Sequence, residues 1–151
     1  MDNKGKILWA DDEIELLKPH ILFLKKKGFI VNAVNSGEDA LSLLKSERFD
    51  IVLLDEMMTG LDGLTTLRLI KVDHPNIPVV MITKNEDEWL MDEALGQQIS
   101  NYLTKPVNPS QVLLACKSIL EKTKLQLSAR RSFPLELIGQ VMRTYWAIRM
   151  D

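Results

Sequence analysis

Short apolar runs and helical repeats alternate five times along the first 124 residues, and this alternation limits the possible folds more than any other feature. The runs are too short to be buried helices, and the run that ends at Asp55 is apolar almost throughout, which is typical of a strand covered on both faces. Parallel strands need crossover connections, which the intervening helices supply. The pattern therefore predicts an α/β domain with a doubly wound, five-stranded parallel sheet. The expected strands are 6–10, 29–34, 49–55, 78–83 and 100–104.

The helices between these strands are predicted from apolar residues at helical spacing and from signals at their ends. Ser36 is the expected N-cap of the second helix. Pro19 falls inside the pattern of the first helix, so a kink is expected there. The fourth helix is expected over 85–95, and the fifth begins at Pro109.

Composition argues against several classes of protein. The net charge of −2 provides no basic field that would attract nucleic acid. No apolar run is long enough to span a membrane and no secretory signal is visible, so a cytoplasmic location is expected. The single cysteine, Cys116, cannot form an internal disulfide, and its apolar surroundings predict a core position.

Four of the five expected strands end in side chains that can do chemistry. Asp11 and Asp12 follow the first strand, Asp55 ends the third, Thr83 ends the fourth and Lys105 follows the fifth. Each has a simpler interpretation when taken alone: Asp11 as a helix N-cap, Thr83 as a strand residue, Lys105 as a surface lysine. The carboxyl ends of parallel strands lie at one edge of the sheet, however, so these groups are expected to converge in a functional site.

The types of these residues indicate the chemistry. Clustered carboxylates repel one another unless a cation offsets their charge. Mg²⁺ prefers oxygen ligands and combines carboxylates with phosphate oxygens. Lys105 adds a positive charge suited to a phosphoryl oxygen, and Thr83 adds a hydroxyl donor. Together they predict a magnesium-dependent site for phosphoryl transfer to Asp55.

Over about residues 5–122 the sequence closely resembles the receiver domain of two-component response regulators. The resemblance implies the CheY-like strand order 2-1-3-4-5 and makes Asp55 the phospho-acceptor. It implies that Mg²⁺ is bound by Asp12, Asp55 and the backbone carbonyl of Met57, with Asp11 acting through water. The matching residues are Asp11-Asp12-Glu13, Asp55, Met58, Asp62-Gly63, Thr83, Tyr102 and Lys105-Pro106.

The same resemblance implies roles for the remaining matched residues. Lys105 would contact the phosphoryl group, and the peptide bond between Lys105 and Pro106 would be cis. Thr83 and Tyr102 would form a switch pair, in which Thr83 moves to a phosphoryl oxygen and the Tyr102 ring turns into the vacated space. Taken alone, Tyr102 would be a half-buried core aromatic.

Two residues depart from the usual pattern of the family, and a third bears on the lifetime of the acyl phosphate. Thr59 replaces a proline, which predicts a less rigid loop after Asp55. Lys84 replaces a small residue, and it would partly block the site or add positive charge. An apolar Met57 beside the path of attacking water predicts slow hydrolysis of the acyl phosphate.

The implied function is a phosphorylation-activated switch, not an enzyme, whose partner is a sensor histidine kinase or a phosphotransfer protein. The acidic residues around Trp89 are most simply a solvated helix face. Alternatively, Trp89 anchors an output surface formed by the fourth helix, fifth strand and fifth helix, through which a homodimer could form. A phosphorylation-independent docking module is the alternative function. An aspartyl-phosphate phosphatase of another fold would need an aspartate where Met57 stands.

The predicted division is a receiver domain over 1–124 and an extension over 125–151. The basic residues of the extension are all arginines, and a helix is expected after Pro134. The extension is a truncated linker, a native helix that docks on the receiver or on a second copy, or sequence added during cloning. Parts of the receiver are also similar to the PorX-type regulators of Bacteroidetes, which carry a PglZ output domain. No such domain is present in these 151 residues.

Overall fold

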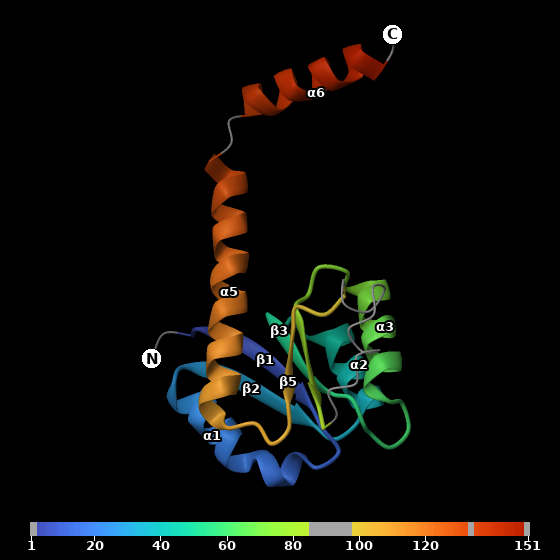
Figure 1. Cartoon of the computed structure of the whole chain (residues 1–151), viewed down its shortest axis with the longest axis vertical. Helices are drawn as coiled ribbons and strands as arrows, with labels where there is room; N and C mark the ends of the chain where they lie inside the picture. Colours follow the sequence, from blue (N-terminus) through green and yellow to red (C-terminus); the bar gives the residue numbers. More distant parts are fainter. Residues whose placement is uncertain (1–2, 85–97, 133–134, 150–151) are drawn as a thin grey trace. The chain divides into compact units, whose positions relative to one another are not determined.

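The structure is a computed structural model that describes residues 3–84, 98–132 and 135–149. In these residues five parallel strands form one sheet in the order β2-β1-β3-β4-β5 (Figure 1). The predicted α/β fold and the strand order implied by the resemblance are both confirmed. The strands are β1 (Gly5–Ala10), β2 (Phe29–Val34), β3 (Ile51–Asp55), β4 (Val79–Thr83) and β5 (Asn101–Thr104).

Helices cover both faces of the sheet. A short 3₁₀ turn and α1, with the first turns of α5, pack on one face, and α2 and α3 pack on the other (Figure 1). The helix predicted over 85–95, with Trp89, lies outside the described residues, so the labels have no α4. The helical elements are η1 (Ile14–Leu17), α1 (Lys18–Lys26), α2 (Gly37–Ser46), α3 (Gly63–Asp73), α5 (Pro109–Ser132) and α6 (Leu135–Arg149).

The central strand β3 shows why the runs are apolar almost throughout. Successive side chains of a strand point to opposite faces, so Ile51 and Leu53 enter the core below α1 and α5. Val52 and Leu54 enter the core below α2 and α3. All four are fully buried, and each stabilises the fold by about 1.5–3 kcal/mol relative to an exposed position. Cys116 is buried in the first of these cores, as predicted.

Two helix starts test the predictions about helix ends. The Ser36 hydroxyl accepts a hydrogen bond from the Asp39 N–H at 3.1 Å, which confirms the N-cap of α2. The kink predicted at Pro19 is wrong, because α1 begins at Lys18 and places the proline in its first turn. A proline there removes no intrahelical hydrogen bond, since the first N–H groups of a helix have no intrahelical partner.

The chain divides into two compact units, Met1–Leu120 and Glu121–Asp151. The fifth helix begins at Pro109 as predicted, and α5 continues to Ser132. The predicted helix after Pro134 is present as α6. No helix in the described part of the chain is long and apolar enough to cross a membrane.

Candidate functional site

The carboxyl ends of the strands carry the predicted site residues. Asp11 and Asp12 directly follow β1, Asp55 is the last residue of β3, and Lys105 directly follows β5. β1 and β3 are paired, and β4 and β5 continue the sheet from β3. The parallel arrangement therefore places the ends of all these strands at one edge, and it brings these four side chains together.

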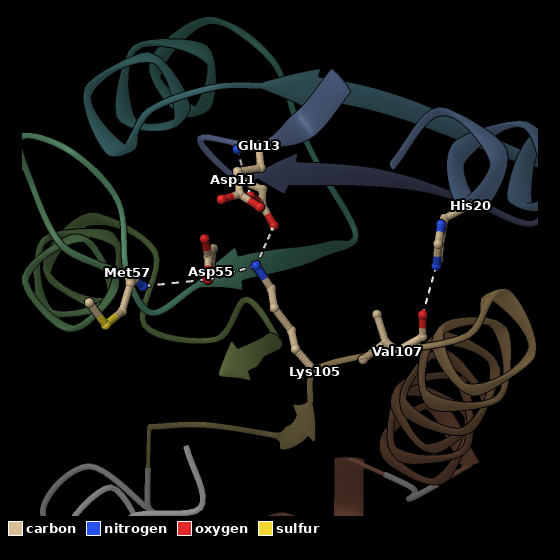
Figure 2. Close-up of polar contacts among 7 residues, drawn as sticks. All are labelled: Asp11, Glu13, His20, Asp55, Met57, Lys105 and Val107. Atoms are coloured by element: carbon tan, nitrogen blue, oxygen red, sulfur yellow. Dashed lines mark hydrogen bonds and ion pairs between the residues drawn. The ribbon is translucent and has the colours of Figure 1, made fainter. Parts of the chain in front are cut away.

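Lys105 connects two of the carboxylates. Its ammonium nitrogen lies 3.2 Å from Asp11 Oδ2 and 3.4 Å from Asp55 Oδ1, and Figure 2 shows the side chain reaching between the two acids. Asp11 and Asp55 are almost completely buried, at 1% and 3% exposure. Side-chain alternation explains the contact, because Asp11, Asp55 and Lys105 continue the positions of β1, β3 and β5 that face α1 and α5.

Three carboxylates form a cluster that could hold a cation. Oxygens of Asp11, Asp12 and Asp55 all lie within 4.8 Å of one another. Burial and the negative charge of Asp11 raise the pKa of Asp55, Lys105 and the Met57 N–H act in the opposite direction, and the net result is a pKa of about 6. The cluster thus consists of oxygen donors whose charge is only partly neutralised, and this fits a hard divalent cation.

The charge on Lys105 is itself maintained by the acids. Burial alone lowers the pKa of this lysine, but the carboxylates of Asp11 and Asp55 outweigh burial and raise its pKa above the ordinary value. Lys105 therefore stays protonated at neutral pH, as a contact to a phosphoryl oxygen requires. The peptide bond between Lys105 and Pro106 is cis, which confirms that prediction.

The loop after Asp55 is held close to the site by backbone contacts. The Met57 N–H donates to Asp55 Oδ1 at 3.4 Å, and the Met57 side chain is 65% exposed. A Cβ at Gly63 would lie 2.3 Å from the Asp55 carbonyl oxygen, so only glycine allows α3 to begin this close to β3. The Leu61 N–H donates to Glu38 of α2 at 3.0 Å, a restraint on the loop in which Thr59 replaces proline.

Thr83 and Tyr102 lie on the same face of neighbouring strands. Tyr102 pairs with Met81, two residues before Thr83, so alternation turns both toward the core that α2 and α3 cover. Thr83 is 1% exposed, and its hydroxyl donates a hydrogen bond to Glu56 Oε2. Tyr102 is half-buried against this core. The arrangement fits a coupled pair, and the switch itself stays a prediction.

A cavity of about 570 Å³ opens over Asp55. Its wall includes Asp12, Glu56, Lys105 and the exposed Lys84. The position of Lys84 directly after Thr83 predicted that it lies beside the site. The structure places Lys84 in the wall of the cavity, where it adds positive charge. The remaining residues of the wall are Glu13, Met57, Met58, Thr59, Asp62 and Leu64.

Two contacts of the site were missed by sequence reasoning. One is the hydrogen bond that the Thr83 hydroxyl donates to Glu56. The other joins His20 Nε2 to the Val107 carbonyl oxygen at 2.7 Å, so that α1 holds the segment two residues after Lys105 (Figure 2). No local signal marks the second pair, because 87 positions separate its members. The first pair could have been found from side-chain alternation once the register of β3 and β4 was known.

Comparisons with known proteins by sequence and by structure relate the chain to response regulators. The sequence model of the family described as "Response regulator receiver domain" matches residues 7–117. The transcriptional regulatory protein PhoP of alkaline phosphatase synthesis, from Bacillus subtilis, is 29% identical over 139 residues, which are 91% of this chain and 57% of PhoP. The transcriptional regulatory protein BaeR of Escherichia coli is 33% identical over 127 residues, which are 83% of this chain and 52% of BaeR.

The chain thus spans about half the length of these curated relatives. Among solved structures, the chemotaxis response regulator CheY4 of Vibrio cholerae is similar with a TM-score of 0.69. The alignment covers 76% of this chain and 98% of CheY4 at 23% identity, and at that identity it bears on the fold alone.

Proposed function

Because the chain belongs to the family of response regulator receiver domains, we propose that it is the phosphorylation-activated switch of a two-component system, with Asp55 as phospho-acceptor. The observation that carries the proposal is the position of Asp55. It ends β3 within one carboxylate cluster with Asp11 and Asp12, and Lys105 lies 3.4 Å away. The family is a regulatory one, so the phosphoryl group on Asp55 would act as a signal.

Mg²⁺ is the cation that fits the cluster best, because it prefers carboxylate oxygens and leaves positions for phosphate oxygens. Asp12, Asp55 and the backbone carbonyl of Met57 would bind it directly, and Asp11 would act through water. When bound, Mg²⁺ supplies positive charge against the carboxylates and the incoming phosphoryl oxygens.

The side chains at the strand ends have different roles in the proposed phosphoryl transfer. An Asp55 carboxylate oxygen attacks the phosphorus of a phosphohistidine on a sensor kinase or a phosphotransfer protein. The new O–P bond forms as the P–N bond breaks, and the imidazole nitrogen keeps the electron pair and takes up a proton. The Lys105 ammonium contacts a phosphoryl oxygen and offsets the charge that arrives.

The signal would then pass through Thr83 and Tyr102. The Thr83 hydroxyl donates to a phosphoryl oxygen, the Tyr102 ring turns into the vacated space, and the population shifts toward an output-competent state. The output surface would lie on the fourth helix, β5 and α5, with Trp89 as its anchor, and it would support a homodimer. Residues 1–124 would form this receiver, and residues 125–151 would form a helical extension of it.

The test is phosphorylation of the purified chain by acetyl phosphate with Mg²⁺, followed by intact mass. The wild-type chain should gain one phosphoryl group, and Asp55→Asn should gain none, because it lacks the attacking oxygen. EDTA should also abolish the gain. Asp73→Asn is the matched control: this exposed aspartate at the end of α3 lies outside the carboxylate cluster, so its variant should react at the wild-type rate.

A folded wild-type chain that gains no mass, or a gain that persists in Asp55→Asn, would contradict the proposal. The first result would favour the alternative function, a docking module that works without phosphorylation.

A further inference from the structure

Glu56 is the hydrogen-bond acceptor of the Thr83 hydroxyl in this structure. The proposed switch needs the same hydroxyl as a donor to a phosphoryl oxygen. The hydroxyl donates a hydrogen bond to Glu56 Oε2. A hydroxyl carries a single proton and can donate it to one strong acceptor at a time. Donation to a phosphoryl oxygen on Asp55 therefore requires that the bond to Glu56 be broken.

The backbone explains why these two side chains meet. Asp55 pairs with Ile82 in the β3–β4 ladder, and the Glu56 N–H donates to the Ile82 carbonyl at 2.9 Å. Glu56 and Thr83 are thus the next pair along this ladder. Alternation turns both toward the face opposite the one that Asp55 occupies.

The side chain of Glu56 can move away from Thr83, whereas its backbone is held in place. Its N–H is bound to Ile82, and its carbonyl oxygen accepts a hydrogen bond from the Gly63 N–H at 2.7 Å. The side chain is partly exposed and lines the cavity of about 570 Å³ over Asp55. A displaced carboxylate can therefore turn into solvent without a change in the backbone.

We propose that Glu56 is a positioning residue that holds the Thr83 hydroxyl in the unphosphorylated protein. It thereby raises the level of phosphorylation that is needed to populate the active state. The inference rests on the proposed function of Asp55 and Thr83. A hydrogen bond to a carboxylate is about twice as strong as one between neutral groups, so its loss on activation opposes the active state. Glu56 acts through Thr83 and forms no bond to the phosphoryl group.

The test is a titration of the full chain with beryllofluoride, a phosphoryl mimic, in the presence of Mg²⁺ and followed by ¹⁹F NMR. Glu56→Ala should bind the mimic about tenfold more tightly, because no charge-assisted bond has to be broken. Glu56→Gln keeps a neutral acceptor and should fall between Glu56→Ala and the wild-type chain. Its near-isosteric side chain also gives a result if the alanine variant does not fold.

Two controls separate this effect from simple charge removal. Glu13→Gln removes one negative charge from the same cavity, and its effect on the affinity should be well below that of Glu56→Ala. In a Thr83→Val background the hydroxyl is absent, so Glu56→Ala should change the affinity no more than Glu13→Gln does.

Equal effects of Glu56→Ala and Glu13→Gln, or a full Glu56→Ala effect in the Thr83→Val background, would overturn the role of Glu56. Those results would leave the proposed function intact if the wild-type chain still binds beryllofluoride at Asp55. A folded wild-type chain that binds no mimic and takes no phosphoryl group would overturn both.

Discussion

Two tryptophans from the two units of the chain differ in their surroundings although both sit in apolar sequence patterns. Trp9 of β1 is fully buried in the unit Met1–Leu120, whereas Trp146 of α6 is 57% exposed in the unit Glu121–Asp151. β1 lies between two paired strands, and helices cover both of its faces. An apolar pattern therefore predicts which face of a helix or strand is suited to burial. Whether that face is buried depends on another element that packs against it.

The helix α5 shows the same contrast within one element. Its first turns bury Val112, Cys116 and Ile119 against the sheet. Farther along, Leu125 and Leu127 are 70% and 50% exposed. The helix continues because its backbone hydrogen bonds are local, whereas the burial of its side chains requires other elements that cover them.

The largest expected effect tests this contrast directly. Trp9→Ala should lower the free energy of unfolding by about 3–5 kcal/mol, because it leaves a cavity in the core. Trp146→Ala should change it by no more than about 0.5 kcal/mol. Urea unfolding of the two variants and the wild-type chain measures both values.

Trp9→Phe is a matched control, since it keeps an aromatic ring and removes an indole N–H that has no hydrogen-bond partner among the described residues. It should cost clearly less than Trp9→Ala. A loss in Trp146→Ala as large as that in Trp9→Ala would show that the face of α6 is packed in solution.

A smaller effect concerns the buried acid of the first unit. Without divalent cations, Asp55→Asn should raise the free energy of unfolding at pH 7 by about 1–3 kcal/mol, because it removes a charge that burial and Asp11 disfavour. The ordinary pKa of this carboxyl is 3.8, and in the folded protein it is about 6. Between these values the folded chain binds more protons than the unfolded chain, so wild-type stability falls as pH rises through this window.

The measurement is urea unfolding in EDTA from pH 4 to pH 7 for both proteins. The difference between them should grow across this range, and Mg²⁺ should reverse it, because only the wild-type chain has all three carboxylates. A difference independent of pH and of Mg²⁺ would contradict the electrostatic explanation.

The smallest expected effect comes from the extension. A chain that ends at Lys124 keeps every site residue and the buried turns of α5, so it should accept a phosphoryl group at the wild-type rate. Its free energy of unfolding should change by no more than about 0.5 kcal/mol. Acetyl phosphate reactions and urea unfolding of the two lengths test this, and a large loss of either property would refute the proposed division at 124.

The sequence allowed most of the fold to be predicted because its signals are local. Periodicity marked the strands, the Ser36 hydroxyl marked the start of α2, and the polar residues after apolar runs marked the edge of the sheet. The error at Pro19 has a local cause as well, since apolar spacing alone could not divide the pattern into η1 and α1.

The site was predictable as a set of residues and not as a set of contacts. Parallel strands place their carboxyl ends at the same edge of a sheet, so Asp11, Asp55 and Lys105 could be grouped from the sequence. The partners of Glu56 and His20 could not, because they depend on the β3–β4 register and on how α1 packs against the segment after β5.

The sequence by itself determined the alternation of strands and helices and the chemistry collected at the strand ends, since both follow from residue types and their spacing. Only the tertiary structure decided that Lys105 lies between Asp11 and Asp55, that Glu56 holds the Thr83 hydroxyl, and that burial along α5 stops partway. These features come from distances between segments far apart in the chain, and such distances exist only after the sheet and its helices have packed together.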